Sequence, residues 1–200
     1  MLAQRIANNL YSISLGPVNA FLVDAKDGSV LIDTGHPNSA SKILYAIEEL
    51  GKSASDICHI VLTHAHPDHI GSAAALKSAT GAAVYAHSSD AAIVTRGSGF
   101  RRMVPSPGWV NTMLFRIFVG RVETVDPVGV GCEVEDGQVL PIAGGITAVH
   151  APGHSAGHLA LLWPENGGVL FAGDACANIF GLGWSVSYED FVEARHTLGR

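Results

Sequence analysis

Cysteine and charged residues are scarce in this sequence, and their scarcity excludes several classes of protein. Only three of the 200 residues are cysteines, an odd and sparse set that does not form a disulfide framework. Charged residues make up 15% of the chain and hydrophobic residues 48%, which excludes a disordered polymer. The formal net charge is -6, and Arg101 with Arg102 is the longest basic run, so no nucleic-acid partner is expected.

Long apolar runs are also missing from the sequence. No stretch approaches the roughly 18 uninterrupted apolar residues of a membrane-spanning helix. The first residues contain neither the apolar core nor the small-residue cleavage site of a secretory signal peptide. We therefore expect a cytoplasmic protein with no membrane partner, in agreement with the few cysteines.

Short apolar runs alternate with glycine-containing turns, which is typical of an α/β fold. Residues 20–23 and 29–32 predict a β-hairpin, and residues 38–50 predict an amphipathic helix. Further strands are predicted at 57–62, 82–86, 145–150, 159–163 and 169–172, and further helices at 71–79 and 188–198. The two halves resemble each other, so we expect a single domain over residues 1–200, built as a four-layer αββα sandwich.

Residues 97–135 interrupt this regular pattern with several glycines and prolines, and predict a lid or insertion. Their apolar side chains, Trp109, Met113, Phe115 and Phe118 among them, could line a pocket for an acyl or thioester group. The alternatives are a helix packed on the core or a homodimer contact. Three cations of the region could meet a substrate carboxylate or remain in solvent: Arg101, Arg102 and Arg116.

The segment THAHPDH, at residues 63–69, places three histidines and an aspartate directly after a predicted buried strand. His64 and His66 are two residues apart in an extended stretch, so they point the same way and can bind one ion together. Asp68 and His69 follow where the loop turns into a helix, and can face a neighbouring ion. Imidazole and carboxylate ligands suit zinc, iron or manganese. The pattern predicts a metal site, because solvent-facing loop histidines would not be expected to gather this closely.

Two later segments carry side chains of the same kind. His154 lies in the glycine-rich loop APGHSAGH (151–158), and Asp174 follows an apolar strand in FAGDA (171–175). Either residue can instead be an ordinary loop or turn residue. His158 is expected to orient its loop rather than to bind metal. Two more residues, Asp33 and Thr63, either support the ligands or cap local turns.

These segments, together with LIDTG at residues 31–35, resemble the metallo-β-lactamase superfamily, whose HxHxDH signature matches THAHPDH. The four motifs occur in the order of that superfamily and cover nearly the whole chain. The resemblance implies a site with two Zn²⁺ ions. It implies that the first ion would be held by His64, His66 and His154, the second by Asp68 and His69, and both by a bridging Asp174.

The resemblance further implies a metallo-hydrolase that cleaves a small ester, lactone or thioester through a metal-bound hydroxide, including a glyoxalase II-like activity. Asp68 would orient the attacking water and carry its proton. Iron or manganese could replace zinc. One alternative is a mononuclear iron oxygenase resembling the persulfide dioxygenases, and another is a binding protein whose second metal site has lapsed. A β-lactamase is not favoured, because we see no export signal.

One part of the superfamily pattern has no counterpart in this sequence. The pattern includes a further histidine, in a His-Gly loop after the bridging aspartate. Only His196 follows Asp174, and it lies within a predicted helix, where a ligand role is not expected. We therefore expect a C-terminally shortened chain that lacks the final strand and helix, and a weak second metal site.

Overall fold

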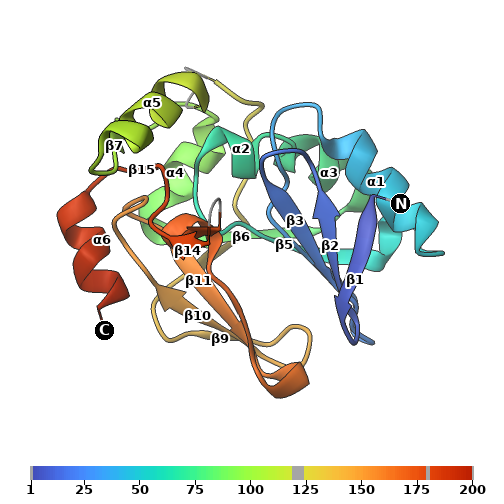
Figure 1. Ribbon diagram of the computed structural model, residues 1–200. Helices are drawn as coiled ribbons and strands as arrows, with labels where there is room; N and C mark the ends of the chain where they lie inside the picture. The colour runs from blue at the N-terminus through green and yellow to red at the C-terminus, as the bar shows by residue number, and fades with distance from the viewer. Residues whose placement is uncertain (1, 119–123, 179–180, 200) are drawn as a thin grey trace.

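Two β-sheets face each other, and helices cover the outer side of the larger sheet (Figure 1). This computed structural model describes residues 2–118, 124–178 and 181–199. The larger sheet has seven strands in the order β1-β2-β3-β4-β5-β6-β8. Their bounds are β1 (Ala3–Ala7), β2 (Leu10–Ser14), β3 (Asn19–Val23), β4 (Ser29–Ile32), β5 (Ile57–Val61), β6 (Ala83–His87) and β8 (Cys132–Val134).

The larger sheet changes from antiparallel to parallel at its centre. Strands β1 to β4 pair antiparallel, whereas β4, β5, β6 and β8 pair parallel. All four residues of β4 are buried, as expected for a strand that is covered on both faces. Because parallel strands end at the same edge of a sheet, the loops that follow β4 and β5 lie side by side.

The smaller sheet is antiparallel and has the order β12-β11-β10-β9. Its strands are β9 (Val139–Leu140), β10 (Ile146–His150), β11 (Leu159–Trp163) and β12 (Val169–Phe171). Buried and exposed side chains alternate along β10, where Ile146 and Ala148 point inward and Val149 outward. Leu162 and Leu170, which pair across β11 and β12, are also on the outer face and are exposed.

Two buried apolar clusters hold the layers together. The first lies between the helices and the larger sheet and includes Ile43, Ile47 and Ile60. The second lies between the two sheets and includes Val61 and Leu161. Complete burial of one side chain of this size stabilises the fold by about 1.5–3 kcal/mol. The first cluster therefore holds the helices on the larger sheet, and the second holds the two sheets together.

Six α-helices are described: α1 (Ala40–Glu49), α2 (Pro67–Ile70), α3 (Ala73–Thr80), α4 (Ser88–Arg96), α5 (Trp109–Phe118) and α6 (Phe191–Leu198). The start of α4 is capped by His87, whose Nδ1 accepts a hydrogen bond from the backbone N–H of Ser89 at 3.1 Å. The carboxylate of Asp190 caps α6 in the same way, by accepting from the N–H groups of Val192 and Glu193. The helix α4 that follows β6 was not predicted from the sequence.

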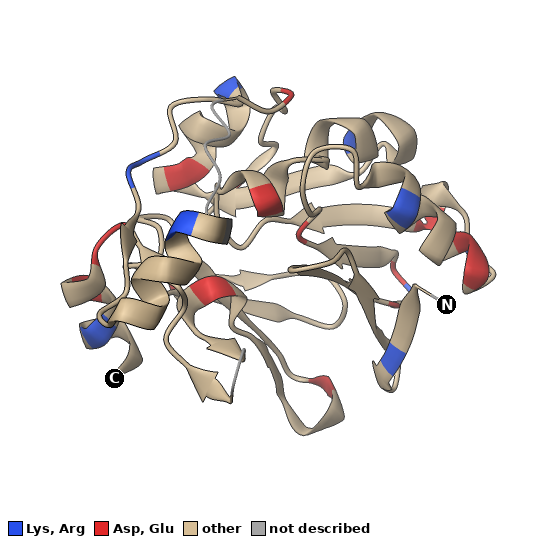
Figure 2. Ribbon diagram, turned by 45° about the horizontal axis from the view of Figure 1, so that its top comes forward, with Lys and Arg blue, Asp and Glu red and all other residues tan. Residues whose placement is uncertain are grey.

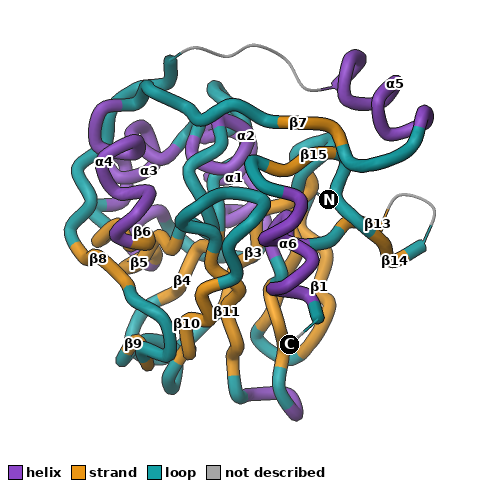
Figure 3. The backbone as a smooth tube through the Cα atoms, turned by 90° about the vertical axis from the view of Figure 1, so that its left-hand side faces the viewer, coloured by secondary structure: helices purple, strands orange, loops and turns teal. Residues whose placement is uncertain are grey.

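Helix α5 lies at the periphery of the molecule, beyond the short strand β7 (Val104–Pro105) (Figure 3). β7 pairs with β15 (Ser187–Tyr188), and a second short pair joins β13 (Ala177–Asn178) to β14 (Leu182–Gly183). Trp109 is 78% exposed, and Met113 and Ile117 are also exposed. The alternative of a helix packed on the core is therefore wrong for Trp109 and Met113, whereas Phe115 is half-buried. The lid and the dimer contact stay predictions, and the side chain of Phe118 lies outside the described residues.

The mixed α/β fold with two facing sheets is confirmed. Among the described residues, no helix combines the length and the apolar character needed to cross a bilayer. Figure 2 shows Lys and Arg positions interspersed with Asp and Glu positions along the ribbon.

Candidate metal site

The predicted ligand segments meet where the two sheets come together. Thr63 follows β5, and its carbonyl accepts a hydrogen bond from the N–H of Leu159 at 2.7 Å, at the start of β11. The N–H of Thr34, just after β4, donates to the carbonyl of His69 at 2.8 Å. The loop from Ala151 to His158 connects β10 to β11. Backbone contacts thus position segments that are distant in the sequence.

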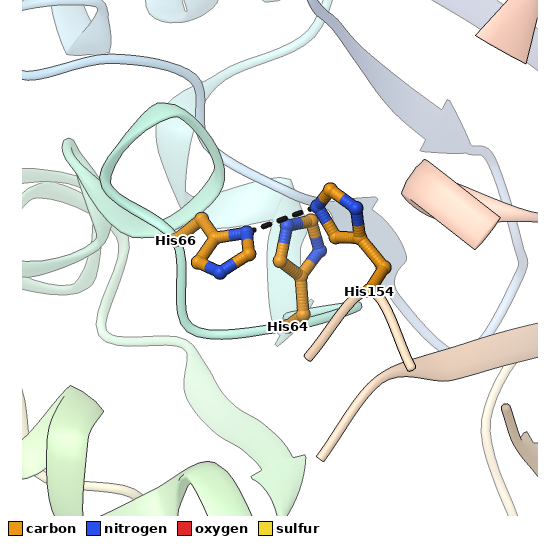
Figure 4. Close-up of side chains that lie close together, drawn as sticks. All are labelled: His64, His66 and His154. Atoms are coloured by element: carbon orange, nitrogen blue, oxygen red, sulfur yellow. Dashed lines mark hydrogen bonds between the residues drawn. The ribbon is translucent and has the colours of Figure 1, made fainter. Parts of the chain in front are cut away.

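Three buried histidines form the first group of side chains: His64, His66 and His154 (Figure 4). One ligand nitrogen of each ring lies within 4.8 Å of those of the other two. His66 Nδ1 and His154 Nε2 face each other at 3.0 Å. Two facing imidazole nitrogens need either a shared proton or a common cation between them, so this arrangement suits a metal ion.

A second group contains His64, His69 and Asp174, again with ligand atoms within 4.8 Å of one another. The carboxylate of Asp174 lies between the two groups. Its Oδ1 is 3.4 Å from His69 Nε2, and its Oδ2 is 3.5 Å from His154 Nε2. One oxygen is therefore directed toward each group, as a bridging carboxylate requires.

The outer nitrogens of His64 and His69 are held by Asp33 and Thr63. Asp33 Oδ2 accepts from His69 Nδ1 at 2.8 Å and from the hydroxyl of Thr63 at 2.7 Å, and Asp33 Oδ1 accepts from the N–H of Thr63 at 2.8 Å. Because that hydroxyl donates its proton to Asp33, it can only accept from His64 Nδ1, which lies 3.0 Å away. Both rings consequently carry a proton on Nδ1 and present Nε2 to the site.

His154 is oriented by the backbone in the same way. Its Nδ1 donates to the carbonyl of Ser187 at 2.9 Å, which leaves Nε2 as the nitrogen that faces the site. The buried Nε2 atoms of His64, His66 and His69 have no hydrogen-bond partner among the described residues. Those of His64 and His69 converge on the site, as His66 Nδ1 and His154 Nε2 do, whereas His66 Nε2 lies beside Glu189. Buried ring nitrogens that converge in this way fit a divalent cation, since each would otherwise carry a desolvation cost.

The protonation states of the cluster also suit a cation. Burial lowers the pKa of His154 to about 4, against the opposing effect of Asp174. Burial, together with neighbouring rings, holds the pKa of His64 well below its usual value. Burial alone would lower the pKa of His69, but the charges of Asp174 and Asp33 outweigh it and raise that pKa well above its usual value. Without a metal, the site thus places a positive charge on His69, between two carboxylates.

The pKa of Asp174 is shifted by its charged neighbours in the opposite direction. Burial would raise its pKa, but the positive charge of His69, whose Nε2 lies 3.4 Å from Asp174 Oδ1, outweighs burial and keeps that pKa below its usual value. The carboxylate is therefore ionised and available as a ligand at neutral pH.

Three other predicted residues lie at or outside the edge of these groups. Asp68 belongs to neither group, and its Oδ2 is 3.9 Å from His69 Nε2. His158 Nε2 accepts a hydrogen bond from the N–H of Asp174 at 3.0 Å, so this ring contacts the bridging residue rather than joining a ligand group. His196 is exposed on α6 and is in neither group. The roles of Asp68 in catalysis and in metal binding stay predictions.

Two carboxylates near the histidines were not found by sequence reasoning. Glu189 Oε1 lies 3.5 Å from His66 Nε2, and Asp90 accepts a hydrogen bond from the N–H of Ala65 at 3.0 Å. Neither belongs to a recognisable motif, and both contacts join residues far apart in the sequence. Arg101, considered above as a ligand for a substrate carboxylate, instead donates to Asp90 at 2.6 Å.

Comparison with known proteins agrees with this geometry. The sequence profile of the metallo-β-lactamase superfamily matches residues 13–183. The chain belongs to the metallo-β-lactamase superfamily, as its motifs indicated. Members of this superfamily depend on metal, and membership supports an enzyme of the metallo-hydrolase kind.

Individual relatives are similar over most of this chain. The protein YobT of Bacillus subtilis (strain 168) is 31% identical over 170 residues, which are 81% of this chain and 63% of YobT. The probable metallo-hydrolase YflN of the same strain is 31% identical over 151 residues, which are 75% of this chain and 56% of YflN. The chain therefore spans less than two thirds of either relative.

Solved structures of metallo-β-lactamases share the fold. The Rm3 metallo-β-lactamase superimposes with a TM-score of 0.77 at 26% identity, covering 100% of this chain and 73% of that protein. The metallo-β-lactamase with a HARLDQ motif from Cronobacter sakazakii gives a TM-score of 0.74 at 26% identity, covering 90% of this chain and 67% of that protein.

Proposed function

We propose that this chain hydrolyses a small ester, lactone or thioester at a metal centre held by its converging histidines and Asp174. The observation that carries the proposal is the meeting of two ligand groups at His64, with Asp174 directed toward both. A divalent cation bound there would polarise a carbonyl and lower the pKa of a water molecule. Zinc suits a site rich in imidazole nitrogens, and iron or manganese also accepts such ligands.

The protein's own residues would position the reactants around this centre. About a third of the Asp68 side chain is exposed, so its carboxylate is accessible from solvent beside the buried rings. Asp68 would orient the attacking water and hold the proton that the water loses. Asp174 would be one of the residues that hold the cation.

The exposed side chains of α5 supply an apolar surface for an acyl group. Trp109, Met113 and Ile117 are four residues apart on one helix, and all three are exposed. The Trp109→Ala variant should raise KM for long acyl substrates more than for short ones and leave the metal content unchanged. A reduced metal content with unchanged substrate preference would contradict the lid, and a change in oligomeric state would favour the homodimer contact.

A mononuclear iron oxygenase is the second candidate, and one observation favours it. The two ligand groups share His64, and one imidazole nitrogen binds one cation. If His64 binds the first ion, the second group keeps only His69 and Asp174, with Asp68 nearby. One tightly bound iron per chain, with consumption of oxygen and a persulfide, would favour this candidate over the hydrolase.

Metal analysis and a substrate panel test the proposal directly. The purified protein is loaded with zinc, manganese or iron and assayed with an ester, a lactone, a thioester and a β-lactam, since the solved relatives include β-lactamases. The His66→Ala variant should lose metal and activity, whereas His196→Ala, a matched change on the exposed helix α6, should retain both. Metal content and turnover that do not differ between these variants would overturn the proposal.

We further propose a small-molecule substrate and a cytoplasmic location. The net charge of -6 disfavours binding to a phosphate backbone. A binding protein with a lapsed second site would instead retain its fold in the Asp68→Ala variant and turn over none of the panel with any metal.

A further inference from the structure

A buried carboxylate outside the ligand groups joins the two loops that carry His64, His66 and His154. Asp90 lies in the first turn of α4 and is 1% exposed. Its Oδ2 accepts hydrogen bonds from the N–H of Ala65 and the hydroxyl of Ser155, both at 3.0 Å. Its Oδ1 accepts from the N–H of Gly157 at 3.2 Å. One side chain thus holds segments that are separated by 90 residues (65 to 155) in the chain.

The donors to this carboxylate are direct neighbours of the histidines. Ala65 is the residue between His64 and His66, and Ser155 immediately follows His154. A shift of either donor would move a ligand ring with it, because a backbone displacement is shared by adjacent residues. The spacing between the two loops therefore depends on the partners of one carboxylate.

Arg101 completes this arrangement from the outside. Its Nη1 lies 2.6 Å from Asp90 Oδ1 and 3.6 Å from Glu189 Oε2. Glu189 Oε2 accepts from the N–H of Ala156 at 2.8 Å, and its Oε1 is 3.5 Å from His66 Nε2. The guanidinium therefore lies between two carboxylates, each of which contacts the loop that carries His154.

Gly157 packs closely against the carboxylate of Asp90. A Cβ atom at position 157 would lie 2.5 Å from Asp90 Cγ, so any other residue would displace the carboxylate or the loop. A buried charge is tolerated only with a full set of partners. Asp90 has four, and three of them come from the ligand-bearing loops.

We propose that Asp90, with Arg101 as its counter-ion, is a positioning residue that fixes the separation of the His64–His66 segment from His154. The inference rests on the proposed metal centre and concerns how its ligands are held before a metal binds. Asp90 touches neither metal nor substrate, and it acts through the backbone of the two loops.

The Asp90→Asn variant tests this inference because it keeps the shape of the side chain. Each oxygen of Asp90 accepts from two donors. Whichever way the asparagine amide is turned, its NH₂ group therefore faces two of these donors and cannot accept a hydrogen bond from them. The affinity for Zn²⁺ or Co²⁺, measured by competition with a chelating indicator, should fall by about 10- to 100-fold. The visible absorption spectrum of the Co²⁺ protein, which reports ligand geometry, should change as well.

Two controls separate positioning from general loss of stability. Asp136→Asn makes the same change in an exposed turn, where Asp136 contacts the N–H of His150, and should leave affinity and spectrum unchanged. Ile47→Ala opens a cavity in the core under α1 and should lower stability without altering the Co²⁺ spectrum. Arg101→Met, at a partly exposed position, should fold readily and reduce the affinity less than Asp90→Asn.

The outcomes distinguish this inference from the proposed function. Normal metal affinity and spectrum in both Asp90→Asn and Arg101→Met, beside a wild type that binds metal, would overturn only the positioning role. A wild type that binds neither Zn²⁺ nor Co²⁺ would overturn the metal centre itself, and the inference with it. Should Asp90→Asn fail to fold, the Arg101→Met spectrum decides the question.

Discussion

Replacing Asp33 with asparagine should disrupt the hydrogen bonds that hold the Nδ1 atoms of His64 and His69, without straining the backbone. Asp33 has a positive φ of 59°, in the left-handed region that asparagine tolerates better than most residues. The amide oxygen of asparagine can still accept from the N–H of Thr63. Its NH₂ group replaces the oxygen that accepts from the Thr63 hydroxyl and from His69 Nδ1.

The expected cost follows from these two lost acceptors. A buried donor left without a partner costs about 1–3 kcal/mol, so two such losses give about 2–6 kcal/mol. The hydroxyl of Thr63 can rotate to accept from the new amide, which places the expected loss of unfolding free energy in the lower half of that range. Asp33→Ala should lose about 1–2 kcal/mol more, because alanine is strained at positive φ.

Asp33→Asn should also weaken metal binding through His69. With a donor in place of an acceptor, His69 Nδ1 must give up its proton. The ring then becomes neutral and keeps its proton on Nε2, the nitrogen that faces the site, where it opposes a cation. Urea unfolding with a chelator present measures the stability term, and a metal titration measures the second effect. Unfolding free energy within about 0.5 kcal/mol of the wild type, together with unchanged metal content, would refute the reasoning.

Three further variants test other contacts. Burial, and after it the neighbouring His150, lower the pKa of His87 in the folded chain. The unfolded chain therefore binds the proton more readily, and stability falls as the pH drops below about 6.5. His87→Asn keeps a helix cap and should lose less unfolding free energy than the wild type between about pH 7.5 and pH 5.5, measured with urea. Tyr188→Phe removes a buried hydroxyl that bonds two backbone groups and should cost about 1–3 kcal/mol in the same assay. Gly153→Ala puts a Cβ atom 2.4 Å from the backbone of Ala194, so it should displace α6 and lower the melting temperature, measured by circular dichroism.

The central elements of the fold were predicted because their residues carry a clear local pattern. Strand β4 and strand β5 are short apolar runs, and α1 has apolar residues at helical spacing ahead of a glycine. Strands β1 and β2 were missed. The middle three residues of β1, an edge strand, are all exposed, and Ile6 is the only apolar side chain among them, so β1 has no apolar run. Helix α4 was missed because its sequence begins with serines and its buried face includes Asp90.

The candidate site, like the fold, could be predicted only where its residues lie close together in the sequence. His64, His66 and His69 share one motif, so their grouping could be predicted from their spacing alone. The contacts of Asp90 join residues 25 and 65 positions apart, and no periodicity or motif relates such positions. A carboxylate on a helix has the same sequence signature whether it faces solvent or supports a loop. Only the packing of α4 against both loops tells these cases apart.

The supporting contacts explain why the ligand nitrogens converge before any cation is bound. Asp33, Thr63 and the carbonyl of Ser187 are fixed by the fold, and each engages the Nδ1 atom of a histidine. Each ring is therefore held by a bond on its outer side, and its Nε2 atom has only the interior of the site to face. The free energy that keeps these nitrogens together is provided by folding. A cation therefore needs to displace protons, from His69 and from the contact between His66 and His154, rather than to gather its ligands.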